Sequence, residues 1–258
     1  MMELSAEQLR HFLDHKVAQF NGAEFIESDP VSIPHRYTQS GDREVAAFFA
    51  AILAWGNRKS ILNSAQDLMQ RMDNAPMEFV LHHTPSDLKR LRTFVHRTFN
   101  GQDAQYFVRA LQSIFQEYGS MEPLFAAYMN RDGDTAQTIH HFRNRFLQID
   151  PTSRTAKHVS DPLKGSAAKR IQLFLRWMVR KDHHGVDFGI WKSCSPSALC
   201  IPLDVHVGNV ARSLGILKRT QHDWKAVMEL TQHLRSLDPA DPIKYDFALF
   251  GLGVFEDW

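Results

Sequence analysis

Lys169 and Asp204 are two residues whose types and positions could do chemistry together. Lys169 lies in the first turn of an expected helix, where the helix dipole disfavours a positive charge and favours a nucleophilic amine. Asp204 immediately precedes the apolar-periodic stretch "VHVGNVARSLGI" and therefore falls at the N-cap of another expected helix. A capping carboxylate is stabilised in its charged form, which suits a group that must stabilise a developing cation. Each residue also has a simpler interpretation, Lys169 as a solvent-exposed lysine and Asp204 as a cap alone.

The segment around Lys169 has the features of an anion-binding turn. In "SDPLKGSAAKRIQLFLRWMVRK" a proline and a glycine break the chain, and Ser166 is expected to cap a helix over residues 167–181. Backbone N–H groups at such a helix start donate readily to a phosphate, and neighbouring cations would add to the attraction. The alternative interpretation is an ordinary turn between a loop and a helix. The residues concerned are Lys164, Gly165, Ser166, Lys169 and Arg170.

Positive charge is concentrated in one part of the chain, although the formal net charge is only +1. The stretch from Arg154 to Lys181 contains eight Lys or Arg residues and a single acidic residue, Asp161. A local excess of this kind indicates a polyanionic partner, with a solvated helix face as the alternative.

Composition and length restrict the class of protein. The 258 residues are 43% hydrophobic and 23% charged, which is typical of a soluble globular protein. No apolar run approaches the length of a transmembrane helix, and the first residues lack the apolar core of a secretory signal. Cys194 and Cys200 are too few for a disulfide scaffold or for a four-cysteine iron–sulfur cluster, and they suit a reducing cytosol.

The periodicity of apolar residues is helical almost everywhere, so the sequence predicts an all-α protein. "REVAAFFAAILAWG" is apolar all round and predicts a buried helix, and a second helix is expected over residues 61–72. "SDLKRLRTFVHRTF" is among the further segments expected to be helical. No alternating strand with an Asn-Gly or Asp-Gly turn is present, so no sheet is expected.

Adjacent histidines raise the question of a metal site. Neighbouring residues on a helix point in different directions, and none of the pairs has the i, i+4 spacing with a nearby glutamate that a zinc site uses. No metal and no other cofactor is therefore expected. The pairs are His82-His83, His140-His141 and His183-His184.

The combination of a basic turn, Lys169 and "PLDVH", with Asp204 at 35 positions after Lys169, resembles the helix-hairpin-helix (HhH-GPD) superfamily of DNA glycosylases. "EVAAFFAAILAWGNRKSILNSAQDLM" and "DFALFGLGVF" are similar to an early and a late helical segment of that superfamily. The whole sequence resembles most an uncharacterised bacterial family beside the archaeal-type 8-oxoguanine glycosylases. There are departures, because "LKGSAAK" lacks the Gly-Val-Gly hairpin signature and the interval between the two residues is longer than in the endonuclease III type.

The resemblance implies a two-lobed helical fold, with one lobe over residues 42–203 and the other over residues 1–41 plus 204–258. It implies a monomeric, cytoplasmic, nucleoid-associated protein that acts on double-stranded DNA and needs no membrane. The implied reaction is removal of a damaged base, with an oxidised purine such as 8-oxoguanine as the first guess, by cleavage of the N-glycosidic bond. Asp204 would stabilise the oxocarbenium ion, and water or Lys169 would be the nucleophile. Attack by Lys169 would add abasic-site lyase activity through a Schiff base.

The resemblance also suggests which residues contact the substrate. Trp55, Trp177 and His206 are the candidates for the base pocket or for a wedge in the duplex, with core packing as the alternative for both tryptophans. The DNA-binding candidates are Lys164, Gly165, Ser166, Arg170, Asn57 and Arg58.

Two other functions remain open. A non-catalytic helix-hairpin-helix protein would bind nucleic acid through the same basic turn without needing Asp204. An enzyme for a nucleoside or another small metabolite would use Lys169 and Asp204 in a closed pocket, and its binding would lack a steep dependence on salt.

Overall fold

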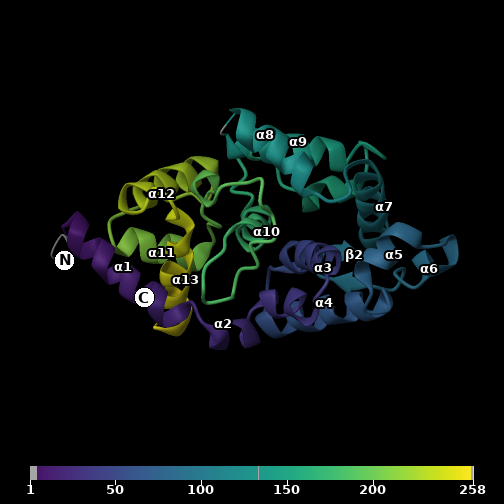
Figure 1. Cartoon of the computed structure of the whole chain (residues 1–258), viewed down its shortest axis with the longest axis horizontal. Helices are drawn as coiled ribbons and strands as arrows, with labels where there is room; N and C mark the ends of the chain where they lie inside the picture. The colour runs from purple at the N-terminus through teal and green to yellow at the C-terminus, as the bar shows by residue number, and fades with distance from the viewer. Residues whose placement is uncertain (1–4, 133, 257) are drawn as a thin grey trace. The chain divides into compact units, whose positions relative to one another are not determined.

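The computed structural model describes residues 5–132, 134–256 and 258, and it is mostly helical (Figure 1). This confirms the all-α prediction at the level of secondary structure. The α-helices are α1 Ala6–Phe20, α2 Ala23–Ser28, α3 Ser40–Leu53, α4 Arg58–Arg71, α5 Pro76–His82, α6 Pro85–Lys89, α7 Gly101–Tyr118, α8 Glu122–Asp132, α9 Thr135–Phe146, α10 Lys169–Val179, α11 Val205–Ser213, α12 Trp224–Leu237 and α13 Tyr245–Phe255. The 3₁₀ turns are η1 Pro30–Ser32, η2 Pro34–Arg36, η3 Arg154–His158, η4 Pro162–Lys164, η5 Pro196–Ala198 and η6 Pro242–Lys244, and the strands are β1 Val95–His96 and β2 Phe99–Asn100. Among the described residues no helix is both long and apolar enough to cross a membrane.

The chain forms two compact units. One comprises Met1–Glu27 together with Asp161–Trp258, and the other comprises Ser28–Ser160. These boundaries differ from the lobes that the sequence predicted, 42–203 and 1–41 plus 204–258. The reason is that α10 packs and pairs with the C-terminal segments, as the ion pair between Arg176 and Asp246 shows.

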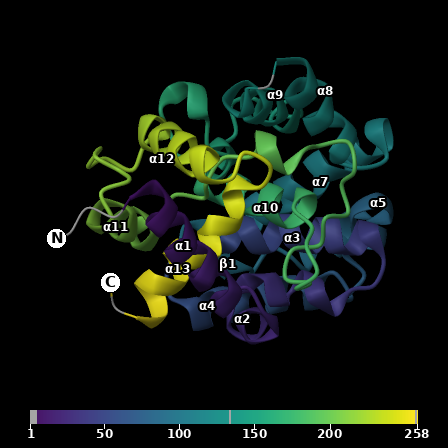
Figure 2. The ribbon, with the colours of Figure 1, turned by 60° about the vertical axis from the view of Figure 1, so that its left-hand side comes forward.

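The discontinuous unit is built around α13, which lies beside both α1 and α11 (Figures 1 and 2). Two glycines of "FGLGVF" permit this close packing. A Cβ atom at Gly251 would lie 2.2 Å from the Phe20 ring of α1, and one at Gly253 would lie 3.0 Å from His206 Cβ of α11. Any larger residue at 251 would push the two helices apart. The glycines therefore hold the N-terminal helix and α11 against the same central helix.

The continuous unit, Ser28–Ser160, has an aromatic core around α3. Every residue from Val45 to Leu53 is fully buried, which confirms the prediction for "REVAAFFAAILAWG". Phe48 of α3 contacts rings from α7 and α9, and the centroids of Phe107 and Phe146 are 4.7 Å apart.

A short antiparallel hairpin in this unit contradicts two expectations. Residues 86–99 were predicted to be one helix, but α6 ends at Lys89 and β1 pairs with β2 beyond it, His96 opposite Phe99. The turn between the strands begins at Arg97, whose φ of +55° is unusual for a residue with a side chain. The strands are two residues long and their turn lacks the usual Asn-Gly signal, so the sequence pattern could not reveal them.

Candidate active site

Lys169 and Asp204 lie together in the discontinuous unit. The Lys169 Nζ atom is 3.6 Å from Asp204 Oδ2, although 35 positions separate the two residues. Their side chains are 27% and 20% exposed, respectively, so both are held by the fold and both can be reached from solvent. The structure thus brings together the two residues that the sequence singled out.

The two carboxylate oxygens of Asp204 have different partners. Oδ1 accepts a hydrogen bond from the Val207 N–H at 3.0 Å, which makes Asp204 the N-cap of α11 as predicted. Oδ2 faces Lys169. The expected end of this helix is also confirmed, because Gly215 follows it with a φ of +74°. The capping interpretation and the catalytic one are therefore compatible in one side chain.

The turn before Lys169 differs from the prediction. Ser166 was expected to cap a helix over residues 167–181, but α10 begins at Lys169 and ends at Val179. Ala168 adopts a left-handed conformation with φ +48°, and the Ser166 hydroxyl accepts from the Ala168 N–H at 3.2 Å instead of from the helix. Lys169 is consequently the first residue of a helix that has no side-chain cap. An uncapped helix start beside an ammonium group favours an anionic ligand.

The same turn is fastened to the start of α12. The Trp224 N–H donates to the Gly165 carbonyl at 3.0 Å, and Ser166 forms an isolated antiparallel bridge with Asp223. Gly165 has a φ of +88°, which glycine adopts without strain. Lys164 and Gly165 are exposed and remain candidates for contact with a phosphate backbone.

Arg170 is half-buried, and burial lowers its pKa to about 10. His206 is exposed, and its Nδ1 lies 3.1 Å from the Gly253 carbonyl, which fixes the ring beside α13. Trp177 is fully buried in the core, so its predicted role as a stacking surface for a base is wrong for this structure. Its apolar neighbours on α10 account for the burial.

A buried carboxyl, Asp246 of α13, lies within electrostatic reach of the pair. Burial raises the pKa of Asp246 to about 6, Arg176 acts against this, and Asp204 adds to it. Arg176 forms an ion pair with Asp246 and a second one with Asp187, in which Nε is 3.2 Å from Oδ1. These residues could not be singled out from the sequence, because only their burial and their ion pairs set them apart.

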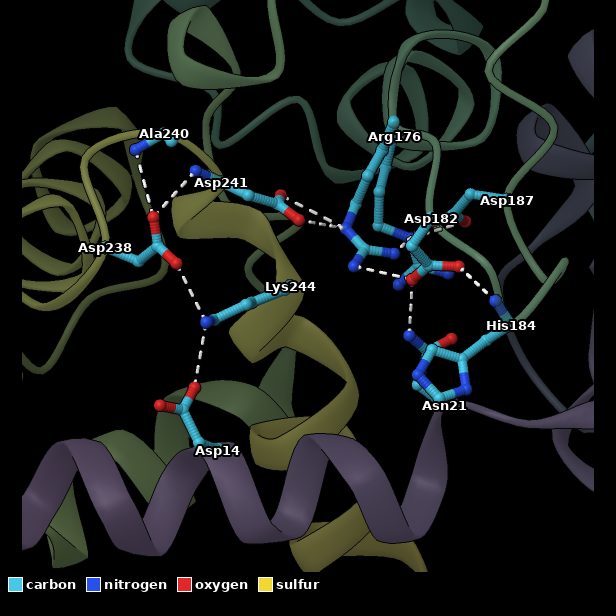
Figure 3. A network of polar contacts seen from close by, with 11 residues as sticks. Asp14, Asn21, Arg176, Asp182, His184, Asp187, Asp238, Ala240, Asp241 and Lys244 are labelled. Carbon is cyan, nitrogen blue, oxygen red and sulfur yellow. Dashed lines mark hydrogen bonds and ion pairs between the residues drawn. The ribbon is translucent and has the colours of Figure 1, made fainter.

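The network continues to Arg180, the C-cap residue that follows α10. Figure 3 shows Arg176 and the carboxylates of Asp182, Asp187 and Asp241 in this network. Arg180 pairs with Asp187 at 3.0 Å, with Asp241 at 3.0 Å and with Asp182 at 2.8 Å. These contacts anchor the long connection between α10 and α11. The exposed positive charge of residues 154–181 is therefore smaller than the count of basic residues indicates, since two of the arginines are buried in ion pairs.

Three of the predicted substrate contacts belong to the other unit, Ser28–Ser160. Trp55 is half-buried, and the guanidinium of Arg97 lies 4.8 Å from its ring. Asn57 caps α4 by accepting from the Ser60 N–H at 3.2 Å, and Arg58 Nη1 donates to Ser28 Oγ at 3.3 Å. Asn57 remains exposed, so its local geometry is compatible with a contact to DNA.

The adjacent histidines do not form metal centres in the part of the chain that the structure describes, where no group of three or more His, Cys, Asp or Glu residues could hold an ion. The rings of His183 and His184 contact one another at a tilt, with centroids 4.3 Å apart.

Comparison with known proteins places the chain in a family without assigning an activity. Residues 29–255 match the family described as "Protein of unknown function (DUF2400)", and because the match covers most of the chain, the chain belongs to that family. No curated protein and no solved structure matches it. The function must therefore be argued from the geometry of the site.

Proposed function

We propose that this member of the family is a DNA glycosylase that removes a damaged base and uses Lys169 as its nucleophile. The observation that carries the proposal is the approach of Lys169 Nζ to within 3.6 Å of Asp204 Oδ2, with both side chains partly open to solvent. A lysine at the start of one helix and a carboxylate at the cap of the next is the pair that the resemblance to helix-hairpin-helix glycosylases implies.

The pair can carry the reaction in two steps. As the N-glycosidic bond weakens, positive charge develops on the sugar, and the Asp204 carboxylate stabilises it. Lys169 first gives up a proton to water, and its free amine attacks C1′ as the base leaves with the bonding electrons. The secondary ammonium group formed by this attack then passes its proton to the departing base. Ring opening then gives a Schiff base between Lys169 and the sugar. Loss of a C2′ proton and cleavage of the C3′–O bond complete the lyase step.

Binding of a DNA strand is supported by the turn before Lys169. Lys164 and Gly165 are exposed, and α10 starts without a side-chain cap. Both features favour a phosphate group. An oxidised purine such as 8-oxoguanine stays the first lesion to test, on the resemblance alone.

The experiment is borohydride trapping on duplexes that contain an abasic site or 8-oxoguanine. Borohydride reduces a Schiff base to a stable amine, so wild type is expected to become covalently attached to the DNA. Lys169→Ala should give no adduct, because the attacking amine is gone. Asp204→Asn should slow base removal by about 100-fold or more, because the cation then loses its stabilising charge.

Two matched variants control for unspecific effects. Lys225 is an exposed lysine in the first turn of α12, and Asp134 caps α9 as Asp204 caps α11. Lys225→Ala and Asp134→Asn should both trap as wild type does. Alkali-labile breaks without any adduct would show that water is the nucleophile. If no breaks appear either, while the duplex is still bound, the protein is a non-catalytic nucleic-acid-binding protein.

A further inference from the structure

Arg212 and His222 meet at one point on the surface of α11. A Cβ atom at Gly208 would lie 2.5 Å from His222 Nε2 and 3.0 Å from Arg212 Nη1. Both nitrogens therefore lie within 3.0 Å of a single position that only glycine leaves empty. Because one of these side chains comes from the helix and the other from a loop, their meeting requires the loop to be held in place.

Arg212 itself holds the loop. Its Nε donates to the Arg219 carbonyl at 2.9 Å and its Nη2 donates to the Thr220 carbonyl at 3.0 Å. At the other end of the loop, Arg219 forms an ion pair with Asp223, and the Trp224 N–H donates to Gly165 in the turn before Lys169. The loop that carries His222 is thus fixed both to α11 and to the candidate DNA-binding turn.

Both side chains have N–H groups that are available to a ligand. Within residues 5–132, 134–256 and 258, no acceptor bonds to Arg212 Nη1 and no hydrogen bond involves either ring nitrogen of His222. His222 is exposed, and Arg212 is half-buried. Guanidinium and imidazole N–H groups that converge in this way match the oxygens of a phosphate.

Arg212 and His222 are connected to the candidate active site through α11. Asp204, Gly208 and Arg212 are spaced four residues apart, so they follow one face of α11. The Gly208 N–H donates to the Asp204 carbonyl at 2.9 Å, which places the Arg212–His222 junction one helical turn beyond Asp204.

We propose that Arg212 and His222 form a phosphate subsite that binds a phosphodiester of the DNA strand whose sugar is attacked at Lys169 and Asp204. The proposal rests on the proposed function in so far as the phosphate belongs to DNA. The shared chemistry is a tetrahedral phosphate, and a free phosphate ion is the other possible source of it.

The charges around His222 define how the subsite responds to pH. Partial burial lowers the pKa of His222, the Arg212 guanidinium lowers it further, and the Asp204 carboxylate acts in the opposite direction. A bound phosphate stabilises the imidazolium and therefore raises this pKa. Affinity for a phosphodiester, whose charge does not change in this range, should consequently increase as the pH falls through the titration range of His222, and His222→Gln should remove that dependence.

The test on DNA is the salt dependence of binding to a duplex with a non-cleavable abasic-site analogue, measured by fluorescence anisotropy on the full chain. Loss of one phosphate contact reduces the slope of log affinity against log salt by about 1. Arg212→Ala should show this reduction at every pH, and His222→Gln should show it at a pH low enough for the imidazole to be charged. Gly208→Ala keeps both residues and favours the helix, but its methyl group displaces the imidazole and should act like His222→Gln. Arg10→Ala and His11→Gln, on the exposed side of α1, should leave the slope unchanged.

A second measurement does not depend on DNA. The imidazole signal of His222, assigned by its loss in His222→Gln, is titrated by NMR with and without inorganic phosphate. The pKa of His222 should rise with phosphate in wild type but not in Gly208→Ala. If phosphate shifts this pKa while wild type fails to bind duplexes, the subsite takes free phosphate and the proposed function is overturned. If the slopes of the Arg212 and His222 variants equal those of Arg10→Ala and phosphate causes no shift, the subsite is overturned, whether or not trapping on Lys169 succeeds.

Discussion

At the scale of single residues, the candidate site consists of a few charged side chains within electrostatic reach of one another. Asp204 caps α11 with one oxygen and faces Lys169 with the other, while Asp246 lies buried within electrostatic reach of both. Arg176 forms an ion pair with Asp246 and so stabilises a second negative charge within electrostatic reach of Lys169. The pair is therefore embedded in a charged network and is not a single surface ion pair.

Asp246 should make the stability of the protein depend on pH. Its pKa is about 6 in the folded chain, against 3.8 as the ordinary value, because burial penalises the charged carboxylate. Between these two pH values the folded chain binds more protons than the unfolded chain, so the free energy of unfolding falls as the pH rises. The raised pKa of Asp246 therefore contributes about 3 kcal/mol to the free energy of unfolding at acidic pH, and this contribution is lost at neutral pH. In urea unfolding followed by circular dichroism, wild type should lose this amount relative to Asp246→Asn between acidic and neutral pH.

Asp182 provides the control for this measurement. Its pKa is lowered because, against the effect of burial, the Asn21 amide and the Arg180 guanidinium stabilise its charge. The stability that it contributes is present at neutral pH and is lost as the pH falls through its folded pKa. Asp182→Asn should therefore show the opposite trend. Equal pH profiles for wild type and Asp246→Asn would contradict the assignment of a raised pKa to Asp246.

At the scale of elements, the cap of α11 separates the structural role of Asp204 from the chemical one. Asparagine is as good an N-cap as aspartate, whereas alanine cannot accept the Val207 N–H. Asp204→Ala should lower the free energy of unfolding by about 1 kcal/mol, and Asp204→Asn should leave it nearly unchanged. Both variants should lose base-removal activity. If Asp204→Asn kept the activity of wild type, the carboxylate would be a cap and nothing more.

The element scale also shows what the sequence could and could not predict. The N-cap of α11 at Asp204, the left-handed Gly215 just after this helix and the buried α3 follow local rules of capping and periodicity, so they could be predicted. The start of α10 could not, because the left-handed Ala168 has a residue type that favours helix.

Side chains whose partners are distant in sequence were missed for a different reason. In the sequence Arg176 is one more basic residue, because the carboxylate that neutralises it, Asp246, lies 70 positions away. In the sequence His222 is an ordinary loop histidine, and only the structure shows that its ring packs against Gly208. Such partners are set by packing, which composition and periodicity do not contain.

At the scale of the whole molecule, the N-terminal helix completes the unit that contains the candidate site. Lys16 of α1 pairs with Glu256 at 2.6 Å, and Asp14 pairs with Lys244, which also holds Asp238 (Figure 3). Leu13 is fully buried on the same helix. The unit is therefore assembled from both ends of the described chain, and its stability depends on residues far in sequence from Lys169.

Leu13→Ala tests this dependence. Truncating a fully buried leucine removes apolar contacts and leaves a cavity, so the free energy of unfolding should fall by about 2–5 kcal/mol. Ile149→Ala is the matched control, because that isoleucine is 42% exposed and its loss should cost less than about 0.5 kcal/mol. Without denaturant, both variants should still be trapped by borohydride, since neither changes the Lys169–Asp204 pair. As urea is raised, trapping by Leu13→Ala should disappear at a lower concentration than in wild type. If it persisted to the wild-type concentration, α1 would not be part of the cooperative unit that holds the site.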